Sequence, residues 1–525
     1  REIRDELEVP RSSGRIAEDL PLVETYGESE TALKAYIKGL NARLFQNDFD
    51  ASNAFFDQAI NTDSNFVLAW FLKAQNSLEN GDIPAAQVAL SKAQELDYRL
   101  PSRDRFLVKA SSYRLSGQHE KLMSFLRLQA RLRDDATAHN TLADMLMLSG
   151  ELEEAKAESL LALERDAFNI GIYLRLSALE RATGNMQAAV EYSRKYQEKK
   201  PEDIHAHIQL GDLLRDSGNL SAAEEQYRQA QVLENNPVQP TLKLSLLAAR
   251  QGDLNAAREY LEEAESYAET PAEKVSVRQG AVLLESRLGK IYEAIRLTLA
   301  QEEFLSQSQG QLAVAMNVHA PLAGYYVQLG DLVMARDAMA TAKSKLQPPL
   351  DKFLAFVEAG IFVKENDLEG ARAALARGEE IVEQFQIKVL EFQVHVIRAK
   401  IAEAEGDFEA VEQHYLAALD ILEHSALAAD LSILVPQTYA EISMAQTKTD
   451  QLDAARRSIE AGFQVDPSEP WLWVAKARLL QAQRLPQLAL ASLGFALAIW
   501  EDADETYTYL DEALALAKEL QAVGS

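Results

Sequence analysis

A glycine recurs along this chain at a nearly constant interval, close to the ~34 residues of a helix-turn-helix repeat. The recurring glycines are Gly81, Gly117, Gly150, Gly184, Gly218, Gly252, Gly289 and Gly330. Five residues after most of them comes an alanine, namely Ala86, Ala155, Ala189, Ala223, Ala257, Ala294 and Ala335. A fixed period of this length predicts one repetitive array of paired helices instead of several unrelated globular domains.

Each feature of the period has a physical reason. The glycine can end the first helix of a pair in a left-handed turn, which other residues adopt only with strain. The alanine lies on the second helix, where a neighbouring helix crosses too closely for a larger side chain. Between Leu220 and Ala230 the apolar stripe also includes Ala223 and Tyr227, at helical spacing. The pattern therefore predicts an all-α fold.

The register extends over most of the chain, to about thirteen repeats. Its small-residue positions fall at Ser52, Ala86, Leu122, Ala155, Ala189, Ala223, Ala257, Ala294, Ala335, Ala371, Val411, Ala455 and Ala489. The spacing is tight up to Ala257 and then loosens, because the later helices are longer. Longer helices change the curvature of a repeat array.

These changes predict four segments. Residues 1–30, with Pro10 and Pro21, are expected to be a linker from an upstream domain, and residues 31–270 a regular array. Residues 271–500 are expected to be an array with longer helices, with interruptions at 270–274 (TPAEK) and 306–311 (SQSQGQ). Residues 501–525 are expected to be a capping helix that starts at Asp502 or Asp504.

The repeat resembles the tetratricopeptide repeat family. In the segment from Ile204 the family's motif residues are Leu210, Gly211, Gly218, Ala223, Tyr227 and Ala230. Trp70 occupies the family's tryptophan place in an earlier repeat, and Pro201 and Pro467 occupy its terminal proline place. The resemblance implies a right-handed superhelical solenoid that binds a protein, a peptide or another ligand in its concave groove.

Two further resemblances concern function. The segments from Thr31 and from Leu100 resemble the C-terminal repeat regions of bacterial membrane-anchored regulators, in which a winged-helix domain, a Ser/Thr kinase or a cyclase precedes the repeats. The later repeats resemble those of bacterial sugar-responsive transcription activators. This implies a sensor and interaction region used in signal transduction. An adaptor for assembly of an envelope or secretion complex is the alternative, and a subunit of an enzyme with an upstream catalytic domain is a third.

Composition narrows the classes of function. The chain has 81 Asp and Glu against 53 Lys and Arg, and its net charge of −28 argues against nucleic-acid binding by this region. It contains no cysteine, which favours an extracytoplasmic, periplasmic location over a cytoplasmic one. No apolar run reaches the roughly 18 residues of a membrane span, so membrane association is expected only through an upstream segment. Homo-oligomerisation is left open.

No catalytic signature is found in the sequence. The HEKLM segment at His119 lacks the second histidine of a zinc-protease helix, and no phosphate-binding glycine loop occurs. His205 and His207 are two residues apart, so on a helix they point to different faces and are poorly placed to share a metal ion. We therefore expect a non-enzymatic protein without a metal or cofactor.

The first helix of each pair is expected to line the concave face, where side chains are free to bind a partner. The candidate partner-binding residues on this face are Asn140, Asp144, Arg175, Arg181, Gln209, Asp212 and Arg215. Arg175 and Arg215 are expected to face solvent. An alternative is that Arg175 pairs with acidic neighbours across repeats and holds the pitch of the array.

The third repeat is unusually basic and is a candidate docking patch for an acidic partner. Its residues are Arg103, Arg105, Lys109, Arg114, Arg127, Arg131 and Arg133. A solvated face balanced by adjacent acidic repeats is the alternative.

Chaperone-binding members of the resembled family grip a carboxylate with a clamp of Lys and Asn residues. Asn41 matches one clamp position, but Ile37 and Leu72 stand where Lys and Asn are needed. The resemblance therefore does not extend to that specificity.

Overall fold

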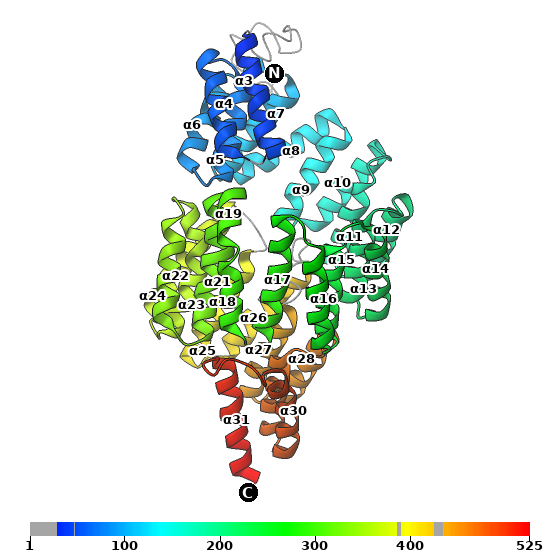
Figure 1. The fold of residues 1–525 in the computed structure, drawn as a ribbon, viewed down its shortest axis with the longest axis vertical. Helices are drawn as coiled ribbons and strands as arrows, with labels where there is room; N and C mark the ends of the chain where they lie inside the picture. The colour runs from blue at the N-terminus through cyan, green and yellow to red at the C-terminus, as the bar shows by residue number, and fades with distance from the viewer. Residues whose placement is uncertain (1–28, 47, 386–389, 425–433, 525) are drawn as a thin grey trace. The chain divides into compact units, whose positions relative to one another are not determined.

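A computed structural model describes residues 29–46, 48–385, 390–424 and 434–524. These residues form helices joined by short turns, and no strand occurs among them (Figure 1). The predicted all-α repeat fold is confirmed, whereas the exact number of repeats and the four segment boundaries stay predictions. Residues 1–28, which make up nearly all of the expected linker, lie outside the described part.

The chain divides into two compact units, each made of several stretches of sequence. The first unit comprises residues 1–128, 303–316 and 341–352. Its elements are α3 (Glu30–Asn41), η2 (Ala42–Gln46), α4 (Phe49–Thr62), α5 (Val67–Glu79), α6 (Ile83–Glu95), η3 (Asp97–Arg99), α7 (Ser102–Leu115), most of α8 (His119–Arg133) and of α19 (Glu302–Ser308), and α20 (Gly310–Val314).

The second unit comprises residues 129–302, 317–340 and 353–525. Its first half contains α9 (Ala136–Leu148), α10 (Leu152–Arg165), α11 (Gly171–Ala182), α12 (Met186–Lys199), α13 (Ile204–Asp216), α14 (Leu220–Leu233), α15 (Val238–Arg250), α16 (Leu254–Tyr267), α17 (Pro271–Arg287) and α18 (Ile291–Leu299). Its second half contains α21 (Ala320–Gln328), most of α22 (Leu332–Ser344), α23 (Ala355–Lys364), α24 (Leu368–Phe385), α25 (Glu391–Glu405), α26 (Phe408–His424), α27 (Val435–Lys448), α28 (Leu452–Val465), α29 (Pro470–Ala482), α30 (Pro486–Ile499) and α31 (Thr508–Gly524). η4 (Ala315–His319) and η5 (Leu350–Leu354) span boundaries between the stretches.

The turns between paired helices have the left-handed backbone that the glycine period predicts. All eight recurring glycines have positive φ, from +66° at Gly117 to +81° at Gly252. In later repeats the same turn is made at Asn366, Asp450 and Arg484, with φ of +60°, +62° and +61°. A residue with a side chain adopts this conformation at a cost of roughly 1–2 kcal/mol. The later repeats therefore keep the left-handed turn even where another residue replaces the glycine.

The small-residue register is confirmed by burial. Every one of its positions is buried, and the two with larger side chains, Leu122 and Val411, are only 3% and 4% exposed. Gly211 on α13 faces Tyr227 on α14 so closely that an added Cβ would lie 2.5 Å from Tyr227 Cε1. The close packing of each helix pair thus depends on residues without bulk at the crossing point.

The expected interruption at 270–274 is instead the start of α17. Thr270 caps this helix, and the carboxylate of Glu273 accepts the backbone N–H of Thr270 at 2.8 Å in return. This reciprocal capping box stabilises the N-terminus of the helix, with Pro271 at its first position.

The C-terminal helix also differs from expectation, because α31 begins at Thr508 and not at Asp502 or Asp504. The carboxylate of Asp504 accepts the backbone N–H of Tyr292 at 2.8 Å, at the start of α18. Asp504 therefore caps a helix far away in the sequence instead of its own.

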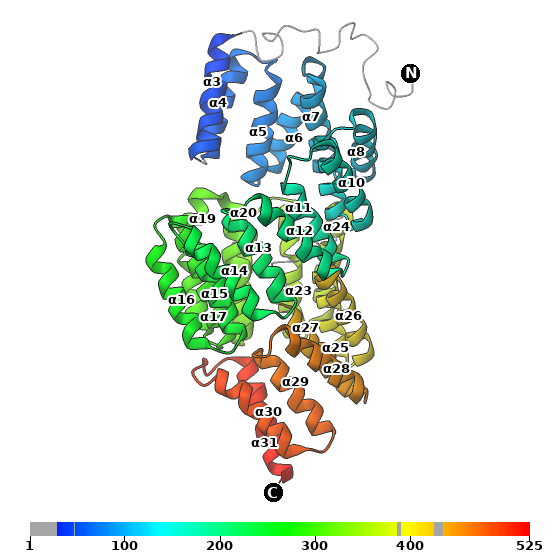
Figure 2. The ribbon, with the colours of Figure 1, turned by 90° about the vertical axis from the view of Figure 1, so that its right-hand side faces the viewer.

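Within the second unit, the last repeats return to pack against α15 and α17 (Figure 2). Ser468 Oγ donates to the carbonyl of Ala249 at 2.7 Å, and Trp500 Nε1 donates to the carbonyl of Arg287 at 3.1 Å. The backbone N–H of Asp504 donates to the carbonyl of Gly289 at 3.0 Å. These bonds go to carbonyls at or just after the C-terminal ends of α15 and α17, where the helices have run out of backbone N–H groups. We call this set of contacts the closure.

The helices of the described residues differ in length and in apolar character. None combines the length and the apolar character needed to cross a bilayer.

Candidate binding groove

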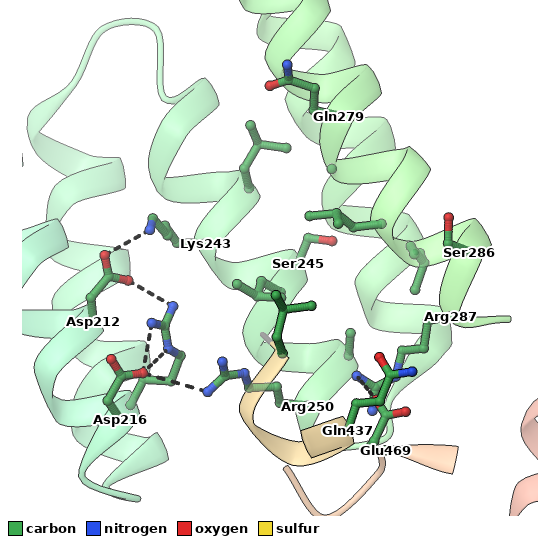
Figure 3. Close-up of a pocket in the computed structure, with 18 of the residues that line it drawn as sticks. Asp212, Asp216, Lys243, Ser245, Arg250, Gln279, Ser286, Arg287, Gln437 and Glu469 are labelled. Carbon is green, nitrogen blue, oxygen red and sulfur yellow. Dashed lines mark hydrogen bonds and ion pairs between the residues drawn. The ribbon is translucent and has the colours of Figure 1, made fainter. Parts of the chain in front are cut away.

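The second unit contains a groove with a volume of about 1020 Å³ (Figure 3). Its walls come from the first helices of successive pairs, α11, α13, α15 and α17, and from α21 and α29. Residues at the N-terminal ends of α27 and α31 and Trp500 complete it. First helices thus supply most of the groove lining, as the prediction for the concave face would require.

Four of the predicted partner-binding residues line this groove: Arg181, Gln209, Asp212 and Arg215. The other three, Asn140, Asp144 and Arg175, are not among its lining residues and gather on α9 and α11. There Arg175 forms an ion pair with Asp144 at 2.7 Å and donates to the side-chain oxygen of Asn140. This is the pairing across repeats that the sequence offered as the alternative for Arg175.

Arg215 is 5% exposed, so the expectation that it faces solvent is wrong. Its Nη1 donates to Asp212 Oδ1 at 3.0 Å, and its Nε and Nη2 donate to Asp216 Oδ1 at 2.9 and 2.8 Å. Lys243 Nζ and the hydroxyl of Tyr227 also donate to Asp212, at 2.8 and 2.7 Å. The arginine lies in the last turn of α13, and its long side chain bonds to two aspartates of the same helix.

Opposite charges set the ionisation of this cluster. Burial alone lowers the pKa of Arg215, but Asp216 and Asp212 outweigh burial and leave the pKa above its ordinary value. Burial alone raises the pKa of Asp212, but Lys243 and Arg215 outweigh it and leave that pKa below its ordinary value. The cluster therefore holds fixed charges at neutral pH.

Arg250, at the end of α15, is the next arginine along the groove. It is 2% exposed, and its Nη1 has no hydrogen-bond partner among the described residues. Its ion-pair partner is Asp216, whose Oδ1 lies 3.7 Å from that nitrogen. Burial and the positive charge of Arg215 lower the pKa of Arg250. Figure 3 shows its side chain extending from α15 toward Asp216.

Arg287, at the end of α17, lines the groove next to the residues of the closure. Its two terminal nitrogens donate to the two carboxylate oxygens of Asp466 at 2.8 and 3.0 Å, and Nη2 also donates to Ser468. Glu469 Oε2 lies 3.7 Å from Nη1. Burial raises the pKa of Glu469, although Arg287 counteracts this.

Three aromatic residues of the last repeats, Trp471, Tyr507 and Tyr509, also line the groove and form an aromatic cluster. The rings of Trp471 and Tyr509 meet edge to face, with centroids 4.6 Å apart, and Tyr507 stands 5.5 Å from Tyr509. Trp471 Nε1 donates to Glu441 Oε1 at 3.0 Å. Burial, followed by the charge of Glu403, raises the pKa of Glu441 to about 7. Aromatic faces of this kind supply large contact area at low entropic cost.

Of the five glutamines that line the groove, three come one each from three successive first helices. They are Gln209 on α13, Gln239 on α15 and Gln279 on α17, and all three are exposed. None of the three makes a hydrogen bond to another described residue. A glutamine amide both donates and accepts, so these groups are free for a ligand.

Sequence reasoning missed Arg250, Arg287 and the aromatic cluster. The arginines carried a usable signal, because Arg181, Arg215, Arg250 and Arg287 each come two or three residues before a turn glycine. The aromatic cluster carried no such signal, because it joins the groove only through the closure.

Two members of the proposed basic patch of the third repeat interact with residues around η3 in the first unit. Lys109 is 7% exposed and its Nζ lies 4.0 Å from Asp97, so it belongs to the interior of the first unit. Arg105 donates to the backbone carbonyls of Asp97 and Tyr98 at 3.1 and 3.0 Å. Both side chains hold the turn around η3.

The other five members of the basic patch differ in their exposure. Arg114 is exposed on α7, and Arg127 is partly buried and engaged in contacts on α8. Arg131 and Arg133 are exposed and belong to the second unit, where Arg133 pairs with a neighbouring aspartate. The side chain of Arg103 lies outside the described part. The docking role stays a prediction for these residues.

Of the two histidines on α13, His207 is buried and contacts neighbouring polar groups. His207 is 9% exposed, with Nδ1 2.9 Å from the amide of Gln197 and Nε2 3.1 Å from the carbonyl of Pro201. Elsewhere in the described residues, no cluster of three or more His, Asp or Glu side chains is placed to hold a metal ion.

Residues 204–236 match the family model described as tetratricopeptide repeat. No curated protein matches the chain. Among solved structures it is similar to the Cut9–Hcn1 hetero-tetramer of the APC/C, with 15% identity, 95% of this chain and 99% of that chain covered, and a TM-score of 0.33. It is also similar to a tetratricopeptide repeat protein of Parabacteroides merdae, with 15% identity, 54% of this chain and 98% of that chain covered, and a TM-score of 0.31. A third similar structure is a Rap protein complexed with competence and sporulation factor, with 14% identity, 61% of this chain and 99% of that chain covered, and a TM-score of 0.36.

The matched segment coincides with α13 and α14, which carry the Gly211–Tyr227 contact and several groove residues. The same turns and the same buried small positions recur before and after it. The chain thus contains a tetratricopeptide repeat at residues 204–236, within a longer array of helical hairpins built on the same pattern.

Proposed function

We propose that this protein is a non-enzymatic scaffold that binds an extended peptide segment of a partner in the groove of its second unit. The observation that carries the proposal is that Gln209, Gln239 and Gln279, on three successive first helices, line the groove exposed and without a hydrogen-bond partner among the described residues. A peptide backbone presents an N–H and a C=O at every residue, and glutamine amides can pair with both.

The groove offers suitable size and chemistry for such a segment. Its volume of about 1020 Å³ is at the upper end of the roughly 300–1,000 Å³ of small-molecule pockets. Leucines from α11 to α17 and the aromatic cluster supply apolar contacts for side chains. Fixed ion pairs at Asp212 and Arg215 keep the floor rigid, so little entropy is lost on binding.

A random-peptide phage library selected on the whole purified chain tests this proposal. The affinity of an enriched peptide, measured by fluorescence polarisation, should fall at least about 10-fold when the three glutamines are changed together to alanine, because each lost hydrogen bond contributes about 0.5–1.5 kcal/mol. The matched control is Gln229→Ala, an exposed glutamine on α14 outside the groove. Failure to enrich any peptide, or equal affinity of the triple variant, would contradict peptide binding in this groove.

As a finer proposal, the array is the sensor and interaction region of a bacterial regulatory protein in an extracytoplasmic compartment. Support comes from the resemblance of the early repeats to such regulators and from the lack of cysteine. A sensor should change its own association state when it is occupied, and analytical ultracentrifugation with and without the enriched peptide measures this. An unchanged sedimentation coefficient at saturation would favour a passive scaffold.

A further inference from the structure

Arg250 is a buried arginine whose nearest carboxylate, Asp216, is shared with Arg215. The carboxylate oxygen nearest to it, Asp216 Oδ1, already accepts two hydrogen bonds from Arg215 and lies 3.7 Å from Arg250 Nη1. That nitrogen is buried and has no hydrogen-bond partner among the described residues. A buried guanidinium in this condition is unfavourable until an acceptor reaches it.

The charge of the groove lining points the same way. Five cationic side chains line it against three carboxylates, in a chain whose net charge is −28. The cations are Arg181, Arg215, Lys243, Arg250 and Arg287, and the carboxylates are Asp212, Asp216 and Glu469.

The excess positive charge can be localised by following the ion pairs. Lys243 and Arg215 are matched by Asp212 and Asp216. On the closure side, Arg287 is matched from behind by Asp466. Arg181, on α11, has an interaction of its own, and the remaining cation, between these two groups, is Arg250. Figure 3 shows it between the aspartates of α13 and the Arg287–Glu469 pair.

We propose that Arg250 is a specificity-determining residue that binds a carboxylate side chain, Asp or Glu, of the peptide segment held in the groove. This inference rests on the proposed function, because it names the chemistry that the groove selects. A carboxylate suits the site because its two oxygens can accept from the fork of a guanidinium, whereas a neutral amide would leave the positive charge unmatched.

The test uses the whole chain and the random-peptide phage library as the probe, selected in parallel on the wild type, Arg250→Gln and Arg228→Gln. Arg228 is the matched control, because it is an exposed arginine on α14 paired with Glu224 outside the groove. We expect wild type and the control to enrich peptides with Asp or Glu at one fixed position. The Arg250→Gln variant should lose this preference.

Affinities then separate the pairing from other effects. Changing the selected acid to its amide should weaken binding to wild type by roughly 10-fold or more, because hydrogen bonds to charged groups are among the stronger ones. The same change should have little effect on Arg250→Gln. Arg250→Lys keeps the charge without the fork, and serves as the second variant if the glutamine variant does not fold. It should bind the acidic peptide more weakly than wild type does.

The outcomes distinguish the two proposals. Enrichment of peptides without an acidic position, or equal loss from the acid-to-amide change in wild type and in the Arg250 variant, overturns the role of Arg250 and leaves peptide binding intact. Absence of any enriched peptide on wild type overturns the proposed function, and the inference with it.

Discussion

Arg287 and Asp466 form a two-pronged ion pair between residues 179 positions apart, with N···O distances of 2.8 and 3.0 Å. Arg287 ends a first helix in the middle of the chain, and Asp466 follows α28 in the last repeats. Both side chains are largely buried, at 11% and 4% exposure. The pair therefore joins α17 to the last repeats beside the contacts of the closure.

Asp466→Asn should destabilise the second unit by roughly 3–5 kcal/mol, because it removes the charge that compensates a buried arginine. Urea unfolding measures this loss, and hydrogen exchange should become faster in α29 and α31. Asp453→Asn is the control, because Asp453 is 84% exposed and its ion pair with Arg456 is long, at 3.8 Å. A loss below about 1 kcal/mol for Asp466→Asn would show that the closure does not depend on this pair.

Asp504→Ala should cost about 1 kcal/mol, the usual effect of removing a helix N-cap. The carboxylate caps α18 from a distance of 212 residues, so its loss should also raise hydrogen exchange at the first turn of that helix. Asp502→Ala removes a neighbouring carboxylate that is 76% exposed and paired only with Lys290. Equal effects of the two changes would argue against a capping role for Asp504.

Glu441 should make stability depend on pH. Burial and Glu403 raise its pKa from 4.5 to about 7, with a smaller increase from Glu512, while the Trp471 hydrogen bond and Lys400 act in the opposite direction. At a pH between 4.5 and about 7, Glu441 keeps its proton in the folded protein but releases it in the unfolded chain. Stability should therefore fall as pH rises through this window.

Glu441→Gln stays neutral and keeps an oxygen for the Trp471 N–H. The variant should be more stable than wild type at pH 8 by roughly 1–3 kcal/mol, and the difference should vanish below about pH 4. Chemical denaturation at both pH values measures this. A variant that is equally stable or less stable at pH 8 would show that ionised Glu441 is fully compensated in the folded protein.

Ala223→Leu should destabilise the protein by roughly 1–3 kcal/mol, because Ala223 is fully buried where two helices cross and the larger side chain must displace its neighbours. Gln229→Leu adds a similar side chain on the exposed side of the same helix and should change stability by less than about 0.5 kcal/mol. Thermal unfolding compares the two variants. Indifference to the buried substitution would mean that the crossing tolerates bulk.

Much of the groove followed from the sequence. The repeat register placed Arg181, Gln209, Asp212 and Arg215 on first helices, and all four line it. Exposure of individual side chains was harder to predict. Arg215 was expected in solvent but folds over Asp212 and Asp216, because a long side chain at a helix end can reach either water or its own neighbours.

The sequence by itself determined the helical pairs, their left-handed turns and their small buried positions, as at Gly218 and Ala223. These features are set by interactions within one repeat or between adjacent repeats, so a local pattern is enough to encode them. Only the tertiary structure decided the closure, the capping of α18 by Asp504 and the approach of Trp471 and Tyr509 to the groove. The physical reason is that small rotations between repeats add up along the array, and their sum decides which distant helices meet.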